Sequence, residues 1–246
     1  MRIRIITPAA LLAGLALFAG QAAAADAGLD AAVPVPAAPT KAEAWTGRVV
    51  ATVTARSAPK PTARKRMVLK TTAPFSGNGT VVLITRRTVV DGVAWVEVLL
   101  PMRPNGTRGW VPQDVLVVSR TKIRVAIDLS ERKLRVFKAG RRVMTASIAI
   151  GKPGTPTPTG PRFAIAERID TNMPGGFLGP IVLPLTGFSE TLNEFAGGNG
   201  RVAIHGTSLP ALIGTRASHG CMRMHNADIV RLARLATPGT PVAISA

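Results

Sequence analysis

Cysteine and histidine are scarce in this chain: its 246 residues include one cysteine and three histidines. A single cysteine cannot form an internal disulfide, which excludes a disulfide-stabilised scaffold. Beyond an N-terminal apolar run, no segment is long and apolar enough to cross a bilayer. Acidic residues are also few, with 13 against 31 Lys and Arg. The length and the 46% hydrophobic content predict one large or two small globular domains.

The positive charge, formally +18, is spread along the chain. Residues 1–119 contain 14 basic and 6 acidic residues, and residues 120–246 contain 17 and 7. No helix-turn-helix, zinc-finger or aromatic RNA-binding pattern accompanies this charge, so we expect no nucleic-acid partner. A basic surface instead suits a compartment that contains anionic polymers and membrane faces.

The first 25 residues have the pattern of a signal peptide: two early arginines, an apolar run over residues 5–20, and small residues that offer a cleavage site after Ala25. We therefore expect export to the periplasm or cell wall. The apolar run is short for a spanning helix, so membrane contact is expected only if the signal stays uncleaved. Residues 26–44, rich in Ala and Pro, predict a semi-rigid linker.

Residues 45–119 predict a small all-β domain, because runs of β-branched residues alternate with turns rich in Gly, Pro and Asn. These runs are RVVATVT (48–54), TVVLIT (80–85) and AWVEVLL (94–100). The closing step Gly109-Trp110-Val111 resembles that of bacterial SH3-like domains, and the resemblance implies a small β-barrel. Trp95 and Trp110 are expected in its core, with a ligand groove as the alternative.

Residues 120–246 predict a second β-rich domain. An alternating meander precedes a loop dense in Gly, Pro and Thr, and a long irregular stretch is predicted for residues 170–200. The remaining predicted elements are a strand at 201–206, a short helix at 208–214 capped by Ser208, a second helix with Asn226 as its N-cap, and a strand at 241–245.

The cysteine and all three histidines lie within 21 positions, as His205, His219, Cys221 and His225. A thiol attacks as its thiolate, and a free cysteine has a pKa of about 8.5, so catalysis near neutral pH needs a neighbouring base. Histidine takes and returns a proton in that range. A strand end at His205 and a loop at Cys221 can meet, and the flexible Gly220 would let a substrate carbonyl approach main-chain amides.

Two other interpretations of this cluster stay open at this point. A lone cysteine is often a small buried hydrophobe without reactivity. Alternatively, the three histidines, Cys221 and Asp228 could ligate zinc, although His-x-Cys-x-x-x-His is not a common spacing for a closed site.

Residues 201–223, RVAIHGTSLPALIGTRASHGCMR, resemble the active-site signature of the L,D-transpeptidases with a YkuD-like catalytic domain. That signature is a strand ending in His-Gly, a spacer, and then Ser-His-Gly-Cys with an Arg two positions further. Upstream, GKPGTPTPTGPRFAI (151–165) resembles the family's Gly- and Pro-rich loop and following strand. The resemblance covers residues 122–245. Together the two resemblances imply a mainly β chain, in which the SH3-like barrel is followed by a β-rich catalytic domain with one or two short helices.

The resemblance also implies a role for individual residues, and it requires no metal and no organic cofactor. It leaves open which group orients the base, with the carbonyl of Gly206 as the group directly after it. The implied set comprises Cys221 as nucleophile, His205 as base and His219 as their catalytic neighbour, Ser218 and Gly220 in the oxyanion-hole loop, and Arg223 and Gly206 on the substrate side.

In the family, the cysteine attacks the carbonyl that precedes the terminal D-alanine of a peptidoglycan stem tetrapeptide and forms a thioester. An amine of another stem then gives a 3-3 crosslink, and water or a D-amino acid are other acceptors. Some β-lactams, notably carbapenems, acylate the cysteine. The resemblance therefore implies a cell-wall enzyme, with cell-wall organisation and cell shape as its setting. The alternative is a non-catalytic, peptidoglycan-binding module of the envelope.

Overall fold

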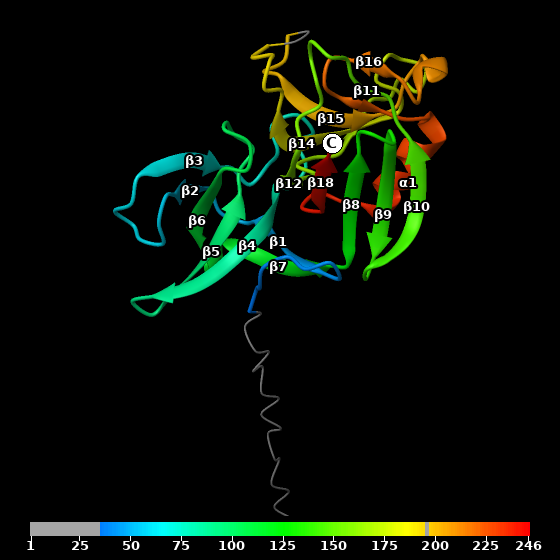
Figure 1. Ribbon diagram of the computed structural model, residues 1–246. Coiled ribbons are helices and arrows are strands. Elements are labelled where there is room, and N and C mark those ends of the chain that lie inside the picture. Colours follow the sequence, from blue (N-terminus) through cyan, green and yellow to red (C-terminus); the bar gives the residue numbers. More distant parts are fainter. Residues whose placement is uncertain (1–34, 195–196) are drawn as a thin grey trace, which may run out of the picture. The chain divides into compact units, whose positions relative to one another are not determined.

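The computed structural model describes residues 35–194 and 197–246 (Figure 1). The predicted signal peptide and the linker as far as residue 34 lie outside the described residues. The described residues belong to one compact unit. Within it, no helix has the length and apolar character that a membrane span requires.

The first seven strands form one antiparallel sheet around a core of its own. Its strand order is β3-β2-β6-β5-β4-β1-β7, and a 3-10 turn at Gln113–Val115 precedes the last strand. Trp95 and Trp110 are 4% and 6% exposed, so the prediction that they belong to the core is confirmed. The strands are β1 (Ala44–Val49), β2 (Val53–Arg56), β3 (Lys65–Leu69), β4 (Val81–Val90), β5 (Val93–Leu99), β6 (Arg108–Pro112) and β7 (Leu116–Thr121).

The remaining strands form two larger sheets, in the orders β10-β9-β8-β18-β12 and β13-β14-β15-β17, and the short pair β11-β16. The predicted fold class, mainly β, is confirmed, and α1 (Asn226–Leu235) is the one α-helix of the described residues. The strands are β8 (Ile123–Asp128), β9 (Lys133–Lys138), β10 (Arg141–Ser147), β11 (Ile150–Gly151), β12 (Gly160–Ala164), β13 (Ile169–Asp170), β14 (Ile181–Phe188), β15 (Arg201–His205), β16 (Arg216–Ser218), β17 (Met222–Arg223) and β18 (Pro241–Ser245).

A single hydrophobic core joins these two larger sheets and the helix. Strand β9 alternates as its sequence predicts, with Leu134 and Val136 buried and the intervening Arg135 partly exposed. Leu183 and Ile204 from the other sheet and Leu232 from α1 belong to the same core. Full burial of such a side chain contributes roughly 1.5–3 kcal/mol. The site described below is therefore built on strands that the core holds in place.

Strand β14 contradicts the prediction of an irregular stretch over residues 170–200. All eight of its residues are buried. The misleading residue is Pro184, because proline lacks an amide proton and argues against a central strand. Here the pairing register of β14 with β15 shifts between Pro184 and Phe188, and the Pro184 carbonyl accepts a hydrogen bond from the amide of Ala166. The strand thus accommodates its proline at an irregularity.

The start of α1 corrects a second prediction. His225 occupies the N-cap position, and its carbonyl accepts hydrogen bonds from the amides of Asp228 and Ile229. Asn226, the predicted N-cap, is the first helical residue, and its side chain serves another purpose described below. The short helix predicted at 208–214 is only a 3-10 turn over Pro210–Leu212, without a side-chain cap.

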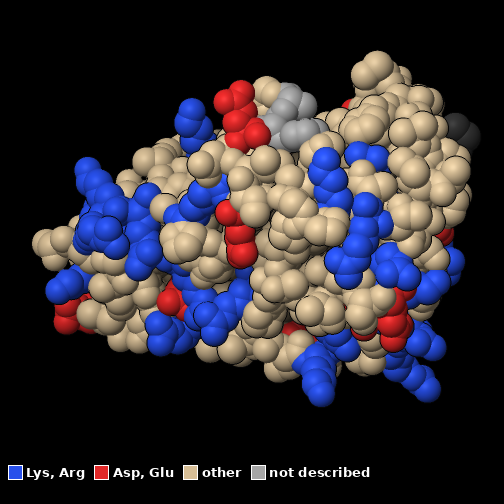
Figure 2. All heavy atoms as spheres, turned by 45° about the horizontal axis from the view of Figure 1, so that its top comes forward, with Lys and Arg blue, Asp and Glu red and all other residues tan. Residues whose placement is uncertain are grey.

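The basic surface expected from the composition is visible in Figure 2, where Lys and Arg side chains are scattered over the face shown and Asp and Glu are fewer. The pattern agrees with the even distribution of charge along the sequence.

Candidate active site

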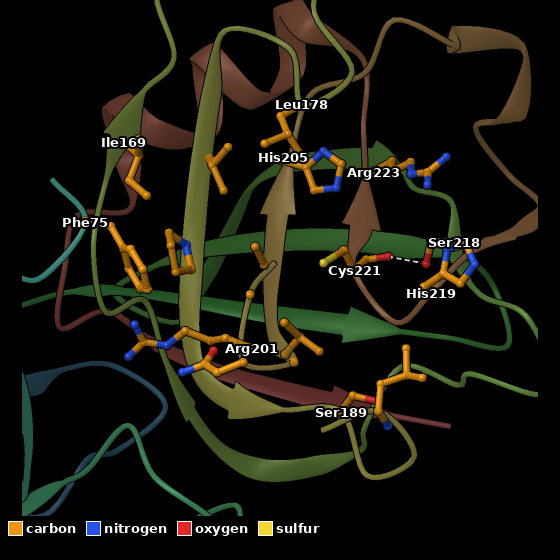
Figure 3. Close-up of a pocket in the computed structure, with 18 of the residues that line it drawn as sticks. Phe75, Ile169, Leu178, Ser189, Arg201, His205, Ser218, His219, Cys221 and Arg223 are labelled. Carbon is orange, nitrogen blue, oxygen red and sulfur yellow. Dashed lines mark hydrogen bonds between the residues drawn. The ribbon is translucent and has the colours of Figure 1, made fainter. Parts of the chain in front are cut away.

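A pocket of about 380 Å³ lies against β14 and β15 (Figure 3). Most of its lining is apolar, including Phe177, Val182 and Ala203. The predicted residues that line it are His205, Ser218, His219, Cys221 and Arg223. The structure thus brings five of the seven predicted site residues into one pocket.

Strand pairing explains why distant parts of the sequence meet here. Strands β15 and β17 are parallel neighbours, with Ile204 opposite Met222 and His205 opposite Arg223. Cys221 directly precedes β17, so the end of one strand and the start of the next carry the histidine and the cysteine (Figure 3). His225 is exposed at the start of α1 and is not among the residues that line the pocket.

Ser218 shapes the cysteine loop from within. Its hydroxyl is fully buried, donates to the Cys221 carbonyl at 2.6 Å and accepts the Gly220 amide at 3.1 Å. Gly220 has a φ of +117°, a conformation that other residues adopt at a cost. Because the Gly220 amide already donates to Ser218, the geometry favours the Cys221 amide as the main-chain donor for an oxyanion.

The Gly- and Pro-rich loop after β11 forms hydrogen bonds to the cysteine loop. The Thr157 hydroxyl donates to the Gly220 carbonyl at 2.9 Å and accepts the Gly151 amide at 3.0 Å. The amide of Lys152 donates to the Ser218 carbonyl at 3.0 Å. Thr157 is a supporting residue of the cysteine loop that the sequence analysis missed, and its place within the Thr-Pro-Thr-Pro motif was the available signal.

The carbonyl of Gly206 orients the His205 ring, with 2.6 Å between the oxygen and Nδ1. A carbonyl oxygen only accepts, so Nδ1 carries the proton of the neutral ring and Nε2 is left as the acceptor. Gly206 packs tightly, because a Cβ on it would lie 2.3 Å from Asn226 Oδ1. Gly206 therefore acts here through its backbone.

Asn226 holds the segment that follows His205. Its Oδ1 accepts the Thr207 amide at 2.8 Å, and its Nδ2 donates to the Pro174 carbonyl at 2.9 Å. One side chain at the start of α1 thus ties the end of β15 to the loop that carries Phe177. The Phe177 ring lies 6.3 Å from the His205 ring, centroid to centroid.

Burial favours the neutral forms of both His205 and Cys221. Burial lowers the pKa of His205 to about 4, the Gly206 carbonyl opposes this, and the nearby Arg223 lowers the pKa further. Burial raises the pKa of the Cys221 thiol, against the lowering effects of a backbone hydrogen bond from Ala203 and of Arg223. The pair is therefore a neutral imidazole and a thiol near pH 7, so the imidazole is able to accept a proton.

Arg223 brings a positive charge to the same end of the pocket. Its guanidinium lies over the Phe177 ring, 4.6 Å from the centroid, and burial lowers its pKa. In residues 35–194 and 197–246, no carboxylate forms an ion pair with Arg223, and its buried Nε has no hydrogen-bond partner. A carboxylate of a bound molecule would complete this site.

The zinc alternative finds no geometric support. Across the described part of the chain, no three His, Cys, Asp or Glu side chains converge as a metal-binding group. Asp228 and His225 lie at the start of α1, while His205 and Cys221 face the pocket.

Replacing His205 with glutamine is expected to weaken the pH dependence of stability. The pKa of histidine is about 6.5 in an unfolded chain and about 4 here when folded. Because the folded value is lower, His205 contributes stability above about pH 6.5 that is lost as the pH falls toward 4. Between about pH 7.5 and 4.5 the wild type should lose about 2 to 3 kcal/mol through this residue, and the variant should not. Urea unfolding across this range measures the difference, and parallel losses in both proteins would contradict it.

Comparison with known proteins identifies the family of the region that contains this pocket's cysteine. The family model of the YkuD L,D-transpeptidase catalytic domain matches residues 122–244. A candidate L,D-transpeptidase YkuD of Bacillus licheniformis is 38% identical over 122 residues, which cover 50% of this chain and 65% of the relative. A candidate L,D-transpeptidase YbiS of Escherichia coli K12 is 30% identical over 161 residues, which cover 60% of this chain and 52% of the relative. The chain thus matches less than two thirds of the length of these relatives.

Solved structures of L,D-transpeptidases are also similar. The catalytic domain of the Enterococcus faecium enzyme, determined by NMR, aligns with a TM-score of 0.36 and 22% identity, covering 50% of this chain and 96% of that one. L,D-transpeptidase 3 of Mycobacterium tuberculosis, solved with a faropenem-derived adduct, aligns with a TM-score of 0.41 and 15% identity, covering 68% and 91%.

The matched region contains His205, His219 and Cys221 of the pocket and the loops that hold them. This chain belongs to the YkuD family of L,D-transpeptidase catalytic domains.

Proposed function

We propose that the protein is an exported L,D-transpeptidase that acts on peptidoglycan stem tetrapeptides through a thioester on Cys221. One observation carries the proposal: the Cys221 thiol and a neutral, oriented His205 line the same pocket. The family to which the chain belongs supports the reaction class.

In the acylation step, the Cys221 sulfur attacks the carbonyl that precedes the terminal D-alanine while His205 Nε2 takes the thiol proton. The oxyanion that forms then accepts a hydrogen bond from the Cys221 amide in the cysteine loop. The C–N bond then breaks, and the imidazolium returns the proton to the departing amine of D-alanine. A thioester and free D-alanine are the products.

In the second step, His205 takes a proton from the acceptor as the acceptor attacks the thioester carbonyl. The sulfur leaves and regains the proton, which restores the thiol. An amine of another stem gives a 3-3 crosslink, and water gives a tripeptide. Because the same histidine alternates between base and acid, no other proton carrier is needed.

Arg223 supports recognition of the donor stem. The carboxylate of a terminal D-alanine lies two bonds from the nitrogen of the amide whose carbonyl is attacked. The Arg223 guanidinium, which forms no ion pair within the described residues, lies near Cys221 and His205. Charge-assisted hydrogen bonds to arginine are strong in a partly buried site. Stems that end in a D-amino acid with a blocked carboxylate should therefore be poor donors.

The test incubates the mature protein with disaccharide tetrapeptides and follows dimer formation and D-alanine release by mass spectrometry. Crosslinked dimers, or tripeptides if water is the acceptor, are the expected products. A folded wild-type protein that releases no D-alanine would refute the proposal.

The alternative, a non-catalytic module that binds peptidoglycan, predicts no covalent chemistry at Cys221. A carbapenem separates the two functions, since the thiol opens the lactam ring and the whole drug mass is added to the protein. The transpeptidase predicts this adduct and the binding module predicts an unchanged mass. Export to the periplasm or cell wall belongs to the proposal because that is where the substrate lies.

A further inference from the structure

The pocket has a second end, far from the cysteine, and the first sheet contributes to it. Phe75 lines the pocket although it lies in the loop between β3 and β4. Its side chain is 59% exposed, so it is not a core residue. Arg201, at the start of β15, lines the same end (Figure 3). Arg201 and His205 are four residues apart on one strand, which separates the two ends by about 13 Å.

A buried carboxylate fixes the Phe75 loop. Glu167, which is 2% exposed, accepts the amides of Phe75 and Ser76 at 3.0 Å each and the Ser76 hydroxyl at 3.2 Å, all on Oε2. Its Oε1 accepts Nη1 of Arg201 at 3.3 Å. The Arg201 guanidinium lies 5.9 Å from the Phe75 ring centroid. The loop tip is therefore attached to the strand that ends at His205.

A second loop of the first sheet, between β5 and β6, forms hydrogen bonds to the end of β14 and to the segment after it that lines this end of the pocket. Asn105 pairs with the backbone of Phe188 in both directions, accepting its amide at 2.8 Å and donating to its carbonyl at 2.9 Å. Arg103 donates to the carbonyls of Ser189 at 2.7 Å and Leu192 at 2.9 Å. Ser189 and Leu192 both line the pocket.

Arg103 also fixes the backbone just before β15. Arg103 Nη2 also donates to the Asn199 carbonyl at 3.3 Å, so one side chain holds backbone on both sides of the segment between β14 and β15. Its guanidinium lies over the Phe188 ring, 4.8 Å from the centroid. The far end of the pocket is thus shaped by side chains that belong to the first sheet.

We propose that the first sheet completes the donor site: Phe75 contacts the stem peptide on the N-terminal side of the attacked carbonyl, and Arg103 and Asn105 position the opposite wall. The inference rests on the proposed function. The exposed Phe75 ring offers an apolar face to the peptide. Arg201, which lies near this ring, is about 13 Å along β15 from His205, and this span matches a donor several residues long. A short acyl donor that fills only the cysteine end does not reach Phe75.

Kinetics of Phe75→Ala test this division of the pocket. With disaccharide tetrapeptide as donor, kcat/KM should fall about tenfold, mainly through KM, the scale of one lost aromatic contact. The rate of Cys221 acylation by a carbapenem should stay within about twofold of wild type. Val93→Ala, at another exposed apolar residue of the first sheet, is the matched control and should change neither rate.

Arg103→Met tests the positioning role and should raise KM for the tetrapeptide while carbapenem acylation continues. Unfolding temperature and the conservative variant Arg103→Lys, which should restore part of the KM, separate positioning from a loss of folding. An unchanged tetrapeptide KM in Phe75→Ala would overturn the inference and leave the transpeptidase proposal standing. Equal slowing of both reactions would also overturn it, because the ring would then act on the cysteine end. A wild type that reacts with neither donor would refute the proposed function, and the inference with it.

Discussion

Replacing Cys221 with serine is expected to reduce D-alanine release by about 10⁴-fold or more, the usual cost of removing a catalytic nucleophile. His205, with a pKa of about 4, is a weak base. It can take a proton from a thiol in the transition state, but a serine hydroxyl is a far weaker acid. Serine is close to cysteine in size, so the fold should be retained. The measurement is product formation from tetrapeptides, together with intact mass after carbapenem treatment.

A matched control for this variant is His225→Gln. His225 belongs to the same cluster of cysteine and histidines in the sequence, but it is exposed, and its backbone carbonyl accepts the first hydrogen bonds of α1. Turnover in the control should stay within about twofold of wild type, since the glutamine keeps the backbone. Full activity in the serine variant, or equal losses in both variants, would contradict the assignment of the nucleophile.

Replacing Gly151 with alanine is expected to destabilise the protein by about 3 kcal/mol, as overpacking against backbone does. A Cβ at this position would lie 2.3 Å from the Thr155 carbonyl oxygen and 2.5 Å from the Thr157 nitrogen. Both are main-chain atoms, so the loop must open to make room. Opening it would break the bridge in which the Thr157 hydroxyl joins the Gly151 amide to the Gly220 carbonyl. The cysteine loop would then lose its support, and turnover should fall as well.

The same loop offers a control in Gly154. A Cβ there would meet no atom within 4 Å, so Gly154→Ala should leave stability and turnover close to wild type. Thermal unfolding and the tetrapeptide assay measure both variants. If the two alanines have the same effect, the close approach at Gly151 is not what shapes the cysteine loop.

The location of the candidate site could be predicted from the sequence because cysteine and histidine are rare in it and because the motifs around them resemble those of the family. One cysteine and three histidines leave few combinations, and the Ser-His-Gly-Cys motif names the loop. The choice of His205 over His225 as the base came from the resemblance to the family, and the structure places the strand that ends at His205 next to β17. Strands β9 and β15 could also be predicted, because the alternation in β9 and the apolar run of β15 are local sequence patterns.

Other parts of the site depend on contacts between distant residues and carry little local signal. Strand β14 was not predicted because Pro184 argues against a central strand. The burial of β14 and its irregular pairing are properties of the folded sheet and leave no local signal. Asn226 has the local pattern of a helix cap, yet its side chain bonds to Thr207 and Pro174. Local propensity cannot reveal whether the Asn226 side chain caps its own helix or bonds to distant backbone, since both arrangements satisfy the same donor and acceptor groups.

By itself, the sequence determined the mainly β class through its short-range periodicity, while its rare residues and its resemblance to the family predicted Cys221 as the nucleophile and His205 as the base. Only the tertiary structure decided what orients and supports them: the Gly206 carbonyl on His205, Thr157 beneath Gly220, and Glu167 between the Phe75 loop and Arg201. The physical reason is that each of these is a hydrogen bond whose partner is fixed by folding. In the case of Glu167, the partners lie 92 and 34 positions away along the chain.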